Sequence, residues 1–156
     1  MTPFAALLES LAFTPGRNGK LDLLRRYFAT TPDPDRGWAL ASLAGTLDLP
    51  HVTGSVIRGL VEERVDPVLF RLSYEYVGDL AETVSLLWPG EADADPPALD
   101  EVVRTLQTAS RSDRSAILAR FLDRLQPSGR LALIKLCTGG MRVGVSARLV
   151  KTALAT

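Results

Sequence analysis

The sequence predicts an all-helical fold, a multi-helix bundle of two lobes. Three observations predict it. Apolar residues recur at the spacing of an amphipathic helix, as Leu21, Leu24 and Phe28 do. The strong helix formers Leu, Ala and Arg are frequent, and strand-like alternation is confined to one ambiguous run at 141–145. Apolar residues make up 46% of the 156 residues, which is enough to bury a core and argues against disorder.

The helices can be placed along the chain by their apolar faces and their start signals. Amphipathic stripes predict helices over 21–28 and 117–125, and the nearly all-apolar stretches 38–44 and 131–137 predict helices buried on most sides. Residues that favour a helix start precede several of these runs: Asp66 before Pro67, Asp79 three residues before Glu82, and Ser112, Ser128 and Ser146.

The segment WPGEADADPPAL at 88–99 is the clearest linker, because its prolines, glycine and acids cannot continue a helix. It predicts a first lobe over residues 1–88, a linker over 89–98 and a second lobe over 99–156. The acids of the linker are interpreted as solvated, with no role in binding a metal.

The two lobes share a pattern at a distance of 94 residues. This shift pairs Arg17 with Arg111, Lys20 with Arg114, and the following apolar stripes with each other, and each pattern leads into one of the all-apolar helices. Internal duplication and chance similarity of two amphipathic helices both explain the pattern, since two copies are weak evidence for a repeat.

Charge is strongly segregated although the formal net charge is zero. Residues 75–101 contain eight acids and no base, whereas residues 102–156 contain ten bases and two acids, a net charge of +8. Such segregation favours a face that is offered to a polyanion. The alternative is that the two segments neutralise each other in the fold.

Enzyme and metal chemistry find little support in the sequence. Cys137 is the only cysteine, so a disulfide within the chain and a cysteine-rich zinc site are excluded. His51 is the only histidine, and nothing near it supports a catalytic triad. No phosphate-binding nucleotide loop, secretory signal or membrane-length apolar run is present. We therefore expect no catalytic residue, metal or cofactor in this chain, no membrane contact, and a cytoplasmic, nucleoid-associated location.

The strongest candidate for binding is the sequence TGGMRVGVSARLV at 138–150. Gly139, Gly140 and Gly144 permit close backbone approach, Arg142 supplies charge, and Ser146 precedes the last helix, an arrangement that suits a phosphate group. Lys135 and Arg148 flank this turn and complete the candidate set. The alternative is an ordinary glycine cap followed by a turn.

Basic helix starts provide two more candidate sites. The first contains Arg17, Asn18 and Lys20, and the second contains Arg111, Ser112 and Arg114. Gly78 is a weaker candidate, because Asp79 would occupy the N–H groups that a phosphate needs. The common alternative is that both basic starts are solvated helix ends.

The order and spacing of three short motifs resemble a known family. VGDL at 77–80, MRVGVS at 141–146 and GRNGKL at 16–21 match the pattern of the amino-terminal DNA-binding domain of bacterial ATP-dependent DNA ligases, with Gly16 where serine is expected. The resemblance covers essentially the whole chain. It implies a two-lobed helical domain that contacts phosphates and sugars in the minor groove around a nick, with little base readout.

The resemblance also implies what this chain lacks. The ligase nucleophile is a lysine in a K-x-D-G sequence, which attacks ATP. Residues 20–23 read KLDL, without the glycine, and no other nucleotidyltransferase motif follows. We expect ATP and magnesium to belong to an absent catalytic domain, and sealing to lie outside this chain.

Sequence-independent binding of nicked or intact duplex DNA is thus the predicted function, in DNA repair, replication or recombination. The expected partners are DNA and a ligase catalytic core where one is present, with the chain itself a monomer. The alternative is a helical protein-interaction adaptor without DNA affinity.

Overall fold

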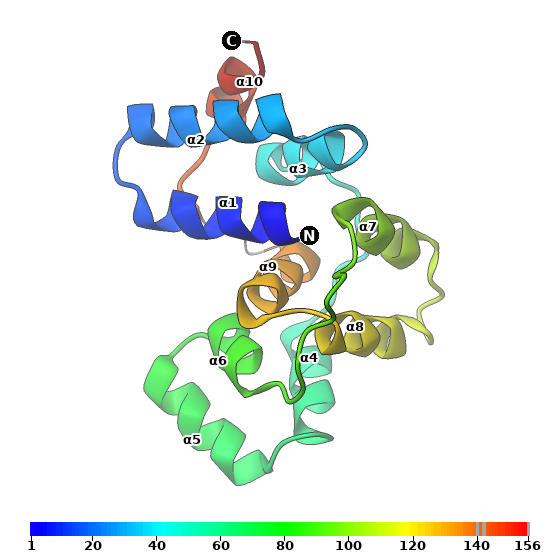
Figure 1. Cartoon of the computed structure of the whole chain (residues 1–156). Coiled ribbons are helices and arrows are strands. Elements are labelled where there is room, and N and C mark those ends of the chain that lie inside the picture. Colours follow the sequence, from blue (N-terminus) through cyan, green and yellow to red (C-terminus); the bar gives the residue numbers. More distant parts are fainter. Residues whose placement is uncertain (140, 142, 156) are drawn as a thin grey trace.

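The computed structural model describes residues 1–139, 141 and 143–155. Within these residues the chain forms ten helices and no strand, which confirms the all-helical prediction (Figure 1). The helices are α1 (Thr2–Phe13), α2 (Arg17–Thr30), α3 (Asp35–Ala44), α4 (Gly54–Glu62), α5 (Pro67–Val77), α6 (Leu80–Leu87), α7 (Leu99–Thr108), α8 (Arg114–Asp123), α9 (Pro127–Thr138) and α10 (Ala147–Ala155).

Several helices begin at the residues that the sequence predicts. The Asp66 carboxylate accepts hydrogen bonds from two backbone N–H groups in the first turn of α5. Asp79 accepts from the Glu82 N–H at 2.8 Å, and the Ser146 hydroxyl accepts from the Leu149 N–H at 3.1 Å. Each bond satisfies an N–H group that has no partner within its own helix.

Two of the helix-start residues, Ser112 and Ser128, do not cap their helices. Ser128 lies inside α9, because Pro127 occupies the first helical position, where its fixed φ is favourable. Ser112 lies in the turn before α8, and the residue at the cap position is Asp113, which makes no side-chain cap. The Ser112 hydroxyl instead lies 3.1 Å from the hydroxyl of Ser110.

Helix α9 is the centre of the core, where it packs against α1, α6 and α8 (Figure 1). Leu133, Ile134 and Cys137 on this helix are buried, as the all-apolar stretch predicts. The same prediction is wrong for α3, where only Ala39 and Leu43 are buried. The other apolar residues of α3 are half-buried, because neighbouring helices cover it on fewer sides.

The helix order repeats along the chain. Adding 94 to the bounds of α1, α2, α3 and α4 gives the bounds of α7, α8, α9 and α10 to within three residues. The glycines that end α3 and α9, Gly45 and Gly139, are also 94 residues apart, and both have left-handed φ angles, of 78° and 74°. Agreement of eight helices and two caps favours internal duplication over chance.

The packing of the repeated helices is reciprocal. Helix α1 packs against α9 and α7 against α3, while α2 packs against α10 and α8 against α4. Each of these pairs joins a helix before the 89–98 segment to one after it. The two sequence segments therefore interlock, and the proposed domain boundary at 89–98 stays a prediction.

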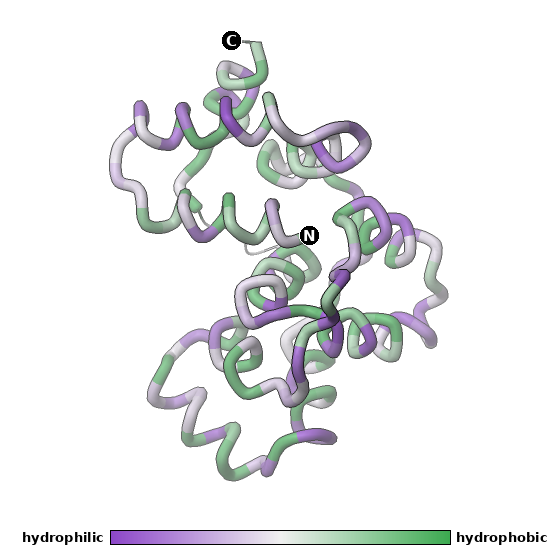
Figure 2. The backbone as a smooth tube through the Cα atoms, in the orientation of Figure 1, coloured by the Kyte–Doolittle hydropathy of each residue, from purple (hydrophilic) through white to green (hydrophobic). Residues whose placement is uncertain are grey.

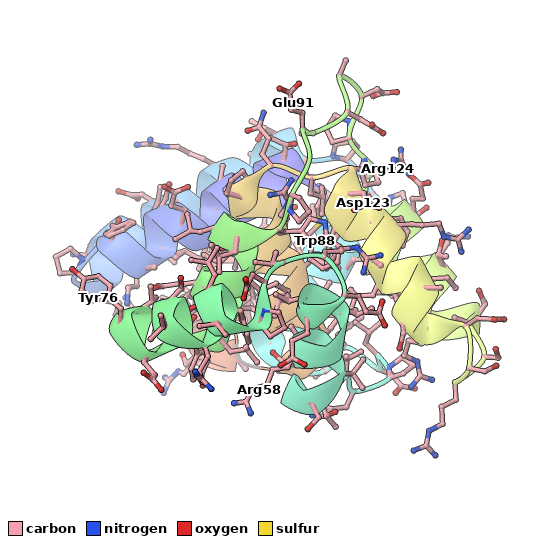
Figure 3. The ribbon with its side chains drawn as sticks, turned by 90° about the horizontal axis from the view of Figure 1, so that it is seen from below. Arg58, Tyr76, Trp88, Glu91, Asp123 and Arg124 are labelled. Carbon is pink, nitrogen blue, oxygen red and sulfur yellow. The ribbon has the colours of Figure 1, made fainter. Side chains whose placement is uncertain are left out.

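The 89–98 segment is held against the fold by contacts just before it begins and in the middle of its acidic stretch. Trp88 Nε1 donates to the Asp123 carboxylate at 2.9 Å, and Figure 3 shows Trp88 beside the end of α8 that carries Asp123 and Arg124. Asp93 accepts from Arg124 Nε at 2.8 Å. Glu91 is exposed, as predicted for solvated acids, but Asp93 forms an ion pair.

Candidate nucleic-acid interface

The early corner, residues 16–20, leaves the first turn of α2 open to a ligand. Gly16 precedes the helix with φ +87°, a conformation that favours glycine over the expected serine, and no side chain caps the helix. Arg17 and Asn18 are exposed on this turn. Uncapped N–H groups beside a cation provide the chemistry that binds an anion.

The late turn, residues 139–146, lies directly against the early corner. Lys20 Nζ donates to the Gly144 carbonyl at 3.2 Å, across 124 residues of sequence. Gly144 has φ +70°, and a Cβ atom there would lie 2.5 Å from Lys20 Nζ. The positive φ favours glycine here, and a larger residue would displace the Lys20 amine. The contact unites two sites that the sequence predicts separately. Gly140 and Arg142 of the late turn lie outside the described residues.

In the described part of the late turn, two glycines are open to a ligand, whereas one backbone N–H group is already hydrogen-bonded. Gly139 and Gly144 are exposed, whereas Val143 between them is buried and anchors the turn. Ser146 is exposed too, but its hydroxyl caps α10 and so occupies one N–H group that a phosphate could use. Arg148 is exposed in the first turn of α10.

The second corner, residues 110–115, lines a cavity of about 180 Å³. Arg111, Arg114 and Ser115 face His51 and Thr53 across it. Its volume is several times the ~30 Å³ that a water molecule occupies in the liquid. The Nε atom of Arg114 is buried and has no hydrogen-bond partner among the described residues. A cavity bordered by two arginine side chains is suited to an anion.

The two corners occupy equivalent places in the repeat. Arg111 and Arg114 stand 94 residues after Arg17 and Lys20, and the loop between α3 and α4 corresponds to the late turn between α9 and α10. In both copies a basic helix start faces such a loop. His51 and Thr53 are not among the binding residues that the sequence predicts, although the 94-residue shift relates their loop to the late turn.

Backbone contacts connect these elements to one another. The Val52 N–H donates to the Cys137 carbonyl at 3.0 Å, so the loop that carries His51 meets the end of α9, where the late turn begins. Gly54, at the start of α4, is so close to α6 that a Cβ atom would lie 3.3 Å from Leu80 Cδ2. The Gly78 turn at the end of α5 therefore lies beside the same group of helix starts.

Comparison with models of protein families identifies the family to which the chain belongs. The family model described as DNA ligase N terminus matches residues 1–155. The chain belongs to this family. No match is found among curated proteins.

The basic corners of this ligase N-terminal domain are free of internal neutralisation. Among the described residues, no ion pair involves Arg17, Lys20, Arg111 or Arg114; the ion pairs that form are Arg25–Asp22, Arg36–Asp33, Arg64–Glu63, Arg104–Asp100, Arg124–Asp93 and Arg124–Glu101. Mutual neutralisation of the acidic and basic segments is thus realised at Arg104 and Arg124, away from the corners.

Two predicted residues do not join the corners in the way the sequence suggests. Lys135 lines a cleft between α1 and α6, together with Val143. Ser112 is exposed and does not line the cavity of the second corner. The helical turn sets the position of Lys135, which lies half a turn from Cys137, a residue that faces the core.

Three findings concern thiol chemistry, metal binding and membrane insertion. Burial raises the pKa of Cys137 to about 12, against a smaller lowering by the nearby Arg114 charge. Within the described ranges, no cluster of three metal-binding side chains occurs. No helix in that part of the chain is both long and apolar enough to cross a membrane.

Proposed function

We propose that this ligase N-terminal domain binds duplex DNA through its sugar–phosphate backbone, in the minor groove and around a nick. The observation that carries the proposal is the repeated arrangement at α2 and α8. Each helix start has no side-chain cap, bears two basic side chains without ion pairs, and faces a loop of the other half of the chain. Two such sites can hold backbone phosphates at two places along one duplex.

Charge and composition of the site determine the kind of recognition. The contacts available are backbone N–H groups, Arg and Lys side chains and the hydroxyl groups of Thr53 and Ser115. Groups of this kind position a duplex and carry little sequence information. Binding therefore releases counterions and weakens steeply with salt.

The test is a titration of labelled duplexes, nicked and intact and of unrelated sequence, by fluorescence anisotropy over a salt series. We expect equal affinity for unrelated sequences and a linear fall of log K with log salt. Competition by a compound that fills the minor groove tests the groove assignment. An affinity that does not change with salt would contradict the proposal and favour the protein-interaction adaptor.

Matched variants assign the contacts. We expect Arg17→Ala and Arg111→Ala each to reduce the salt slope by about one and to weaken binding equally for all sequences. The control is Arg104→Ala, which also removes one positive charge but acts on a residue already paired with Asp100. If all three variants bind alike, the corners are not the site.

We propose further that strand sealing does not reside in these residues, and that ATP and magnesium act in a catalytic domain elsewhere in the ligase. The nearest approach to K-x-D-G starts at Lys20, whose amine is held by Gly144 and points into the DNA-binding site proposed above. Incubation with labelled ATP and magnesium should leave no covalent AMP on the chain. A stable adduct would refute this assignment.

A further inference from the structure

An apolar cleft of about 460 Å³ lies between α1 and α6, on the side of α9 away from the second corner. Small side chains form much of its surface, among them Ala5, Ala12 and Ala132. Large apolar side chains stand at its edges. Phe13 is 81% exposed and Leu86 is 66% exposed, which is unusual for residues of this size in a folded domain.

The apolar surface continues from the cleft onto α5. Leu86 also lines a neighbouring hollow with Leu72 and Tyr76, and Tyr76 is 93% exposed. Figure 3 shows Tyr76 pointing outward at the edge of the molecule. In Figure 2, hydrophobic segments recur along α5 and at the end of α1 on the same side. A continuous exposed apolar surface of this kind marks an interaction site.

The shape of the cleft favours one of the three known modes in which a protein binds a segment of another protein. Strand addition needs a free sheet edge, and the described part of the chain contains no strand. A proline-rich segment needs a groove lined by several aromatic rings, and Phe13 is the single aromatic residue of the cleft. Buried apolar residues below, among them Ala5, Leu8 and Ala132, and large exposed ones at the rim fit the third mode, a helix laid in a groove.

The charges of the cleft select the partner. Each wall carries one acid, Glu9 on α1 and Glu82 on α6, and both are exposed. These are the only charged residues of the two helices. A helix in the groove would place the flanks of its apolar stripe beside these two carboxylates. Lys135, at the end of the cleft near Val143, favours the negative end of a helix dipole, the carboxyl end.

We propose that this cleft binds an amphipathic helix of a partner protein that carries Lys or Arg on both flanks of its apolar stripe. Leu and Phe side chains of the partner fill the space above the alanines, and its bases pair with Glu9 and Glu82. The cleft adjoins the late turn at Val143, but Arg17, Lys20, Arg111 and Arg114 of the corners do not line it, and the proposal does not depend on DNA binding.

The test uses two synthetic peptides of about 14 residues, long enough to span the roughly 18 Å of α1. Both carry the same leucine stripe at helical spacing, one with lysine flanks and one with glutamate flanks. Isothermal titration should detect binding of the lysine peptide, with at least tenfold weaker binding of the glutamate peptide. Equal binding of the two would overturn the charge argument and the proposal.

Variants locate the peptide. We expect Leu86→Ser and the pair Glu9→Lys with Glu82→Lys each to weaken binding of the lysine peptide at least fivefold. The matched control is Leu154→Ser, on α10, which is 46% exposed and does not line the cleft. Because all of these residues are exposed, circular dichroism should show an unchanged fold. Sedimentation tests whether a second copy of this chain occupies the cleft. Self-association that Leu86→Ser abolishes would assign the cleft to that second copy and overturn the proposal.

Discussion

The buried side chain of Arg130 connects α9 to α6, to α8 and to the 89–98 segment. It is 3% exposed, and its guanidinium donates to the carbonyls of Leu122, Ser85, Trp88 and Gly90 at 2.9–3.4 Å. These carbonyls end α6 and α8 and begin the 89–98 segment. Burial lowers the pKa of Arg130, against a smaller raising by the Asp123 charge, and the guanidinium stays protonated at neutral pH.

We expect Arg130→Met to lower the free energy of unfolding by about 3 kcal/mol or more, because it leaves several buried carbonyls without donors. Urea denaturation followed by circular dichroism measures the loss. The control is Arg120→Met, an exposed arginine on α8, which should change stability by less than about 0.5 kcal/mol. A loss as small as that of the control would show that water replaces the guanidinium.

Cys137 gives a second prediction at this scale. Since burial raises its pKa to about 12, the thiol is protonated near pH 8 and is closed to solvent. The folded domain should therefore not react with an aryl disulfide reagent over hours, and should react at once in denaturant. Absorbance of the released thiolate gives the rate. Fast reaction without denaturant would mean that the end of α9 opens readily.

At the scale of elements, the ends of the repeated helices carry a paired prediction. Gly45 and Gly139 both end their helices in the left-handed conformation, and a Cβ atom on either would meet no other atom within 4 Å. Substitution by alanine therefore costs only backbone strain, about 1 kcal/mol at each site. We expect the two costs, measured by urea denaturation, to be equal.

Gly59 provides a control at which substitution by alanine should raise stability and not lower it. It lies inside α4 with ordinary helical geometry, is exposed, and has open space where a Cβ would stand. Gly59→Ala should raise stability by about 0.5–1 kcal/mol, because alanine loses less backbone entropy in a helix. Unequal costs at Gly45 and Gly139 would show that the duplicated caps differ energetically.

Local signals in the sequence predict much of this element structure, and they fail where distant contacts decide. Asp66 and Asp79 cap their helices as predicted, because capping involves only neighbouring residues. The contact of Lys20 with Gly144 spans 124 residues, so no local pattern could reveal it. The same holds for α3, whose burial depends on which helices pack around it. The 94-residue repeat is the long-range signal in the sequence, and it relates the loop that carries His51 and Thr53 to the late turn, which no local pattern does.

At the scale of the whole molecule, the reciprocal packing of the two halves has a consequence for folding. Helices α1 and α2 bury their apolar faces against α9 and α10, and α7 and α8 do so against α3 and α4. Trp38 Nε1 also donates to the Asp100 carboxylate at 2.7 Å, from one half to the other. Neither half can bury its core without the other, so we expect one cooperative unfolding transition.

The two tryptophans report on different parts of the molecule and make the test sharp. Trp38 lies in α3 and bonds to the start of α7, whereas Trp88 lies between α6 and α8, where Arg64 stacks on its ring at 4.6 Å. In urea, the single-tryptophan variants Trp38→Phe and Trp88→Phe should each unfold with one midpoint common to fluorescence and circular dichroism. Because a substitution can itself lower stability, the fluorescence midpoint of each variant is compared with the circular dichroism midpoint of the same variant. A variant whose fluorescence changes well before its helix content would show that the halves unfold separately, and the interlocked packing would then not govern stability.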